Sequence, residues 1–200
     1  MSSTELIITL VTVVIGALIG IVTAHYYYRL GGAARPCLIV AMEERARIDP
    51  STVGVQVDMK IGTIEVTNLV VLDIAVTNKS HRDLVVDDAT DPEKHALRPR
   101  VELPEGLRSL ADPWNPEGVA PGADVRIARQ LREDNRQVLF VHLHRLARGA
   151  TSRTRVLCSY RTGEPPARLS GGDLRFFPGF VPNVDVRPSG LLEGSVRVPA

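Results

Sequence analysis

The chain has 200 residues, 44% of them apolar, a length that suits one domain of ordinary size with appended segments. Its 24 basic and 23 acidic residues give a net charge of +1, and only 4% of the residues are aromatic, which excludes a strongly basic nucleic-acid-binding protein. Two cysteines exclude a disulfide-rich scaffold, and the sequence lacks the P-loop, GxSxG, HExxH and CxxC motifs. We therefore expect a protein that is not an enzyme and holds no metal or cofactor.

The first predicted element is a transmembrane helix over residues 6–28, after a short N-terminal segment at 1–5. The 23 residues between Glu5 and Arg29 include no Asp, Glu, Lys or Arg. About 20 helical residues span the hydrocarbon core of a bilayer. At the end of the span, the residues expected at the membrane interface are Tyr26, Tyr27, Tyr28 and Arg29. The alternative is a cleaved signal peptide, which needs a basic segment that the opening MSSTE lacks.

One face of this helix carries small residues at every fourth position, namely Thr12, Gly16, Gly20 and Ala24. Such a stripe lets another helix pack closely, although glycine is also simply common in membrane helices. Arginines follow the span and none precedes it, so the positive-inside rule predicts an outside N-terminus and a cytoplasmic C-terminal domain. We therefore expect a single-pass protein of the cell inner membrane with a helix-packing face.

After a linker at 29–36, residues 37–172 show the pattern of short β-strands. Apolar residues alternate within 53–61, 70–76, 139–143 and 156–160, and residues that favour turns separate these runs. The segments 38–47 and 125–134 are compatible with helix as well, and we favour strands for both. About seven to nine strands with frequent turns predict an all-β domain, an antiparallel β-sandwich.

Three features carry a resemblance to a known group of proteins: the Tyr-Tyr-Tyr-Arg membrane exit at 26–29, a strand ending in VTNKSHRDL at 76–84, and the turn YRTGEPP at 160–166. In these the chain resembles bacterial single-pass membrane proteins with an immunoglobulin-like cytoplasmic domain. The resemblance implies an immunoglobulin-like β-sandwich and no activity. It does not support a disulfide between Cys37 and Cys158, because Trp114 lies in a predicted loop and not on a core strand. We expect two buried thiols.

Histidines and aspartates offer the best candidates for metal ligands. His142 and His144 project from one face of a predicted strand, a spacing that metal sites use, but the sequence identifies no third ligand. We expect them on the polar face opposite the apolar positions 139, 141 and 143. The acidic residues at 87, 88 and 91 lack the regular spacing of a calcium loop and are expected in a solvated loop.

Charge is distributed unevenly along the chain. Residues 73–117 include ten acidic and six basic residues, whereas residues 125–175 include four acidic and eleven basic residues. The later strands therefore present an arginine-rich surface, made of Arg126, Arg129, Arg132, Arg136, Arg145, Arg148, Arg153 and Arg155. Within it we predict a docking surface formed by Arg145, Arg148, Arg153 and Arg155. Anionic lipid, an acidic protein surface or a phosphorylated ligand would fit it, and the alternative is an ordinary solvated sheet face.

Residues 173–200 are predicted to form an extended Phe- and Pro-rich tail. It holds three of the four phenylalanines, Phe176, Phe177 and Phe180. We expect one ring to close the sandwich core and the others to dock on a partner or bilayer.

The helix face, the arginine-rich surface and the tail are three surfaces suited to binding something larger. They predict a non-catalytic, membrane-anchored accessory or scaffold subunit that docks on an integral membrane protein complex, such as a respiratory or photosynthetic one. The expected partners are that complex and the lipid bilayer, with no nucleic acid. The alternative is a membrane-tethered sensor or effector whose β-sandwich binds a small anionic ligand.

Overall fold

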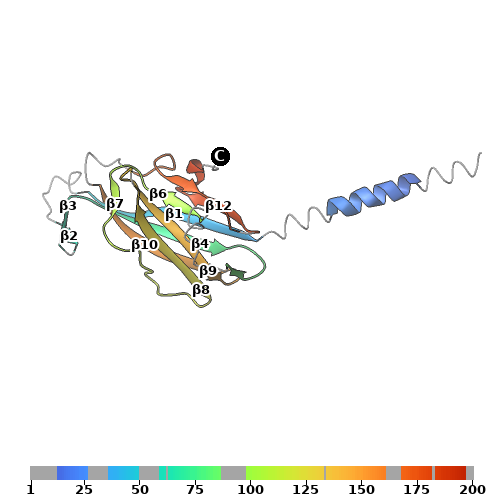
Figure 1. Ribbon diagram of the computed structural model, residues 1–200, viewed down its shortest axis with the longest axis horizontal. Coiled ribbons are helices and arrows are strands. Elements are labelled where there is room, and N and C mark those ends of the chain that lie inside the picture. The colour runs from blue at the N-terminus through green and yellow to red at the C-terminus, as the bar shows by residue number, and fades with distance from the viewer. Residues whose placement is uncertain are drawn as a thin grey trace, which may run out of the picture. The chain divides into compact units, whose positions relative to one another are not determined.

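The computed structural model describes residues 13–26, 36–49, 59–61, 63–86, 98–132, 134–160, 168–181 and 183–196. The chain divides into two compact units, Met1–Arg35 and Pro36–Ala200. The first unit includes a helix at 13–26, and the second is built of β-strands and one short 3-10 helix (Figure 1). The chain is therefore mainly β, as the period-two alternation of apolar residues predicts.

The helix of the first unit covers only part of the predicted membrane span. It has 14 residues, and its apolar side chains, such as those of Ile19 and Ile21, are exposed. Within the described residues, no helix has the length and apolar character needed to cross a membrane. The structure thus gives no support to the predicted transmembrane helix at 6–28, which also takes in 6–12 and 27–28, outside the described residues.

Five strands form the first sheet of the second unit, in the order β12-β1-β4-β10-β7. Their bounds are β1 (Cys37–Ile48), β4 (Leu69–Asn78), β7 (Leu107–Ser109), β10 (Thr151–Tyr160) and β12 (Asp185–Gly190). Along β4 every second residue from Val70 to Val76 is buried, which is the expected pattern for a strand with one face in a core. The neighbours in this sheet are antiparallel except for β1 and β12, which are parallel, so the predicted purely antiparallel arrangement needs this correction.

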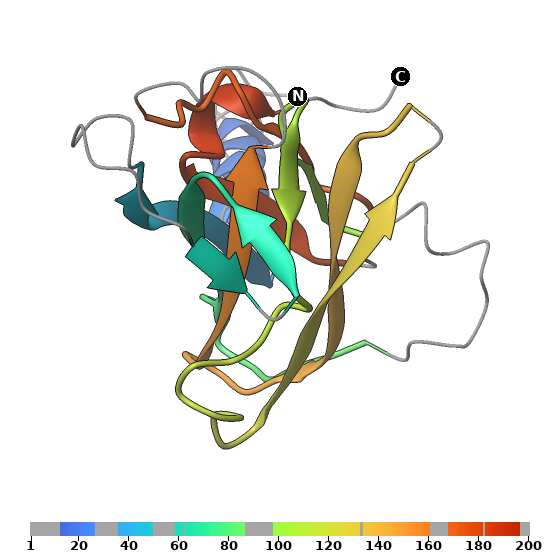
Figure 2. The same cartoon turned by 90° about the vertical axis from the view of Figure 1, so that its left-hand side faces the viewer.

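The second sheet has the order β11-β6-β9-β5, and β8 also pairs with β9. The bounds are β5 (Leu84–Val85), β6 (Arg100–Glu102), β8 (Ala123–Leu131), β9 (Gln137–Leu146) and β11 (Arg175–Phe177). The long strands β8 and β9 form a twisted hairpin (Figure 2). A separate two-stranded sheet consists of β2 (Met59–Ile61) and β3 (Ile64–Val66), and a 3-10 helix, η2, covers Glu193–Ser195.

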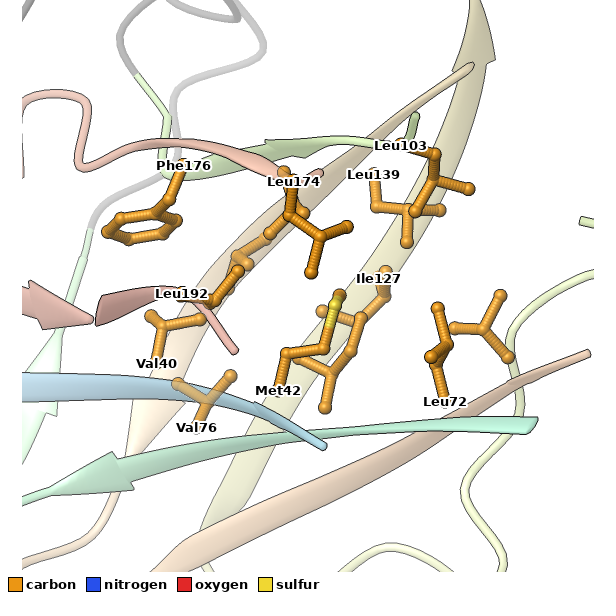
Figure 3. Packing of buried hydrophobic residues seen from close by; sticks show 14 of the residues in the cluster. Val40, Met42, Leu72, Val76, Leu103, Ile127, Leu139, Leu174, Phe176 and Leu192 are labelled. Carbon is orange, nitrogen blue, oxygen red and sulfur yellow. The ribbon is translucent and has the colours of Figure 1, made fainter. Parts of the chain in front are cut away.

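One hydrophobic core joins the two larger sheets. Val40, Met42 and Leu72 come from the first sheet, while Ile127 and Leu139 come from the second (Figure 3). Burial of each such side chain contributes about 1.5–3 kcal/mol to folding. The segments 38–47 and 125–134, for which we favoured strand over helix, lie largely in β1 and β8, which confirms strand in both.

The cysteines and the tryptophan agree with the expected lack of an immunoglobulin disulfide. Cys37 and Cys158 are both free thiols, although Cys37 is only half-buried. Burial raises the pKa of the Cys158 thiol to about 12, so it stays protonated at neutral pH. Trp114 is partly exposed and lies outside the named strands, where it forms an isolated bridge with Arg155.

The C-terminal segment differs from the extended arm that the sequence predicts. β11 pairs with β6 in the second sheet, and β12 pairs with β1 in the first. Leu174, Phe176 and Leu192 are fully or almost fully buried in the shared core (Figure 3). Pro188 is tolerated because β12 is an edge strand, where a missing backbone N–H breaks no ladder. The described part of the tail is therefore integral to both sheets.

Candidate functional site

The four arginines predicted to form the docking surface belong to different sheets. Arg145 lies on β9 in the second sheet, whereas Arg153 and Arg155 lie on β10 in the first. Arg155 pairs with Asp73 on the neighbouring strand, with Nε 2.8 Å from Oδ1. β9 and β10 follow each other in the sequence but belong to different sheets. These arginines therefore do not share one sheet face.

Asp83 contacts two of the four predicted arginines, Arg148 through its backbone and Arg145 through its side chain. Its Oδ1 accepts a hydrogen bond from the backbone N–H of Arg148 at 2.9 Å, and the Arg145 guanidinium lies 3.3 Å from Oδ2. These contacts hold the pKa of the Asp83 carboxyl below its usual value, with the backbone hydrogen bond as the larger cause. Arg145 and Arg148 therefore anchor the connection between β9 and β10.

A different group of arginines lies together on the outer face of the second sheet. Val101, Leu139 and Phe176 are buried in the core, so the residues next to them along β6, β9 and β11 point outward. The register places Phe140, Arg100 and Phe177 in one cross-strand row, with Val138, Glu102 and Arg175 in the next. We call this outer surface the basic face and define it by Arg98, Arg100, Arg126, Arg132, Arg175, Phe140, His142 and Phe177.

Glu102 is the carboxylate at the centre of the basic face. Its side chain is only 4% exposed, and its Oε1 accepts a hydrogen bond from Arg132 Nη1 at 2.7 Å. Arg175 lies 4.0 Å from the other oxygen. A buried carboxylate is stable only when paired, so Glu102 fixes two arginines of the face in place.

The rest of the face combines aromatic and cationic groups. The Arg100 guanidinium lies 4.4 Å from the centroid of the Phe177 ring, a cation–π contact that orients both side chains. Arg98 hydrogen-bonds to the ring of His142. Arg126 is 79% exposed and lies 3.7 Å from Asp124 at the margin. The five arginines of the face outnumber the two carboxylates described beside them, those of Glu102 and Asp124. The described part of this surface is therefore positively charged, and it holds two half-buried aromatic rings.

The candidate metal ligands stand where the sequence places them, on a polar face. His142 and His144 are half-buried on β9, opposite the buried Leu139, Val141 and Leu143. In the described ranges, no three His, Cys, Asp or Glu side chains gather as a metal site. The candidate calcium loop at 87–91 lies outside those ranges.

The edge of β8 borders a small pocket of about 300 Å³ between the two sheets. Val125 and Ile127 line it from β8, and Ser152 and Thr154 line it from β10. Val119, in the loop before β8, is 80% exposed at the same pocket. The site therefore has a partly apolar recess next to a charged surface.

A second, larger cleft of about 620 Å³ lies at a bulge in β1, between Glu44 and Ala46. Arg47 donates to both oxygens of Glu44, at 2.8 and 3.0 Å, and this pairing lowers the pKa of the Glu44 carboxyl. Two further arginines of the lining, Arg45 and Arg168, are exposed. Beta-bulges commonly redirect side chains in this way. Three arginines and two glutamates, Glu43 and Glu44, line the result, a cationic cleft with one positive charge in excess.

Tyr160, the last residue of β10, interacts electrostatically with Arg47 and Glu44, two residues that line this cleft. Burial is the main cause that raises the pKa of Tyr160 to about 12. Among the described residues, its hydroxyl has no hydrogen-bond partner. This is an uncommon condition for a buried polar group.

The other predicted site residues have mixed outcomes. Phe176 is buried and so cannot dock, Phe177 is half-buried in the basic face, and Phe180 is 62% exposed. Gly16, Gly20, Ala24 and Tyr26 are exposed on the helix, and a side chain added at either glycine would touch nothing within 4 Å. The remaining four, Thr12, Tyr27, Tyr28 and Arg29, lie outside the described residues.

Comparison with known proteins identifies no family. No family model matches the chain, and no curated protein matches it. Two solved structures of a GH20 exo-β-N-acetylglucosaminidase from Vibrio harveyi, one with N-acetylglucosamine and one an inactive mutant, are similar to 77% of this chain at 12% identity. The match covers 18% of those chains, with TM-scores of 0.28 and 0.29, and carries no argument about fold or activity.

Proposed function

We propose that this protein is a non-catalytic, membrane-anchored accessory subunit that docks on an integral membrane protein complex through the basic face. The observation that carries the proposal is the gathering of five arginines and two phenylalanines from four segments of the chain on one sheet surface. Arginine and aromatic residues are enriched at protein interfaces, where they supply much of the binding energy. An acidic surface of the complex is the partner that this charge favours.

The anchor and the finer fold belong to the same proposal. Residues 6–28 are an uncharged run long enough to cross a bilayer, and the arginines that follow favour a cytoplasmic second unit. Two sheets around a shared core support an immunoglobulin-like β-sandwich. The basic face would then meet a complex in the same membrane, where tethering raises its effective concentration.

Arg126 provides the direct test, because its side chain is 79% exposed, compared with 51% for Arg132 and 38% for Arg175. Extraction of the tagged full-length chain in mild detergent is expected to recover a stoichiometric heteromeric assembly. An Arg126→Glu variant should reduce the recovered partner about tenfold, since a repulsive charge replaces an attractive one. The matched control is Arg153→Glu, an exposed arginine on the other sheet, which should leave recovery unchanged. A lone monomer from the native chain, or equal losses in both variants, would contradict docking through this face.

The second candidate function is a tethered sensor of small anionic ligands, which the cationic cleft at the β1 bulge favours. The ligand would lie near Arg45 and Arg168, and not at Arg145, whose guanidinium is paired with Asp83. Inorganic phosphate at 100 times its Kd should then stabilise the full-length chain by about 2.7 kcal/mol, measured as a rise in Tm. Arg168→Ala should abolish the rise and Arg153→Ala should keep it. An unchanged Tm, or a rise that both variants keep, would remove the sensor hypothesis.

A further inference from the structure

β8 is an edge strand with a long unpaired side. It has nine residues and pairs only with β9, so it is the longest edge strand among those that the structure describes. Most of its side chains are exposed, including that of Leu131. An open strand edge presents backbone N–H and C=O groups to any extended chain that reaches it.

The hydrogen-bonding pattern tells which residues of β8 face that open side. The backbone N–H of Arg132 donates to the carbonyl of Arg136 at 2.9 Å, just beyond the final register pair of Leu131 with Gln137. Bonded and non-bonded pairs alternate in an antiparallel ladder. The residues bonded to β9 are therefore Arg126, Ala128 and Gln130.

The opposite side of β9 gives the same result. The backbone carbonyl of Gln137 accepts a hydrogen bond from the backbone N–H of Leu103, and the backbone N–H of Val141 donates to the carbonyl of Pro99. The odd-numbered residues in this part of β9 therefore form their backbone hydrogen bonds with the β6 segment. The four residues of β8 opposite them turn their backbone groups to the free edge. They are Val125, Ile127, Arg129 and Leu131.

Side chains on the two sides of this edge differ in character. Outward lies the basic face, with Arg126 at the strand itself and Arg132 just after it. Inward lies the pocket of about 300 Å³, lined by apolar atoms of Val119, Val125 and Ile127. Alternate side chains of an added strand point to opposite faces of the sheet, so acidic residues would suit one set of positions and small apolar residues the other.

We propose that β8 binds an extended segment of the partner protein with alternating acidic and apolar residues, which joins the second sheet as an additional strand beyond β8. This inference rests on the docking function proposed above and names how the partner is recognised. A second copy of the chain fits less well, because two antiparallel β8 strands would bring their own arginines together.

Hydrogen exchange tests this on the full-length chain in detergent micelles, with a seven-residue capped peptide of alternating Glu and Val as the probe. The peptide should slow exchange at the amides of Val125, Ile127, Arg129 and Leu131 by about tenfold or more. The amides of Arg126, Ala128 and Gln130, which already bond to β9, should change little. No slowing at the four edge amides would overturn strand addition.

A matched peptide separates strand addition from charge attraction. It has the same side chains and charge, but its backbone amides are N-methylated, so it cannot donate to a strand edge. It should bind at least about tenfold more weakly than the parent peptide. Equal affinity would mean that charge alone holds the peptide, which overturns this inference and leaves docking through the basic face intact. Edge amides that become protected with rising protein concentration and no peptide would show pairing with a second copy, and would overturn the choice of partner.

Discussion

A Phe176→Ala variant is expected to lose about 3–5 kcal/mol of unfolding free energy, the typical cost of deleting a buried aromatic ring. Phe176 is fully buried and pairs with Val101, while its backbone also forms a bridge with Val196. The ring fills the core from a segment that the sequence alone assigns to a peripheral tail. Equilibrium unfolding in urea, followed by Trp114 fluorescence, measures the loss.

Phe180→Ala is the matched control. Phe180 is the same residue type four positions later in the chain, but its side chain is 62% exposed. Its unfolding free energy should stay within about 0.5 kcal/mol of the native value. Similar losses in the two variants would show that the C-terminal segment does not pack as described.

Asn78→Ala is expected to destabilise the protein by about 3 kcal/mol, because it leaves buried carbonyl groups without donors. The Asn78 side chain is fully buried at the end of β4. Its Nδ2 donates to the carbonyls of Arg82 and Leu146, each at 2.9 Å, and its Oδ1 accepts from the backbone N–H of Ser80, also at 2.9 Å. Leu146 ends β9, so one amide joins the ends of both sheets.

Asn115→Ala is the control for that variant. Asn115 also accepts a backbone hydrogen bond, from Glu117 at 3.0 Å, but in an exposed loop, and its loss should cost less than about 1 kcal/mol. Urea unfolding measures both variants. Equal stabilities for the native chain and Asn78→Ala would exclude the bridging role of this side chain.

Strands were predictable where burial follows a regular alternation. Along β4 and β9 the apolar residues recur at every second position, and these positions are buried in the core. The polar positions of His142 and His144 followed from the same pattern. Residues 53–58, which show the alternation too, lie outside the described residues.

The docking surface was less predictable, because it depends on register and not on proximity in sequence. Arg145 and Arg155 are close in the chain, yet β9 and β10 belong to different sheets. Arg100, Arg126 and Arg175 are far apart in the chain, and only the pairing of β6, β8, β9 and β11 brings them to one face. The sequence could show that each of these arginines occupies an outward position on an alternating strand. It could not show which strands are neighbours in the sheet.

The tail was misjudged for a related reason. Its prolines and phenylalanines favour an irregular segment when each residue is considered alone. β11 pairs with β6 and β12 pairs with β1, and this pairing stabilises strands that the local sequence does not favour. Gly190 allows β12 to lie close to β1, since a Cβ there would lie 2.7 Å from the Met42 carbonyl oxygen. Tertiary contacts therefore outweigh local propensity in this segment.

The parallel pairing of β12 with β1 has a consequence for biosynthesis. Within the second unit, β1 is synthesised early and β12 late, so most of this unit must leave the ribosome before Cys37 can align with Asp185. Until then one edge of β1 stays open and the core lacks Phe176 and Leu192. Contacts this distant in sequence slow folding and expose aggregation-prone edges. A variant truncated before residue 174 should therefore be insoluble when expressed, and should not form a smaller folded domain.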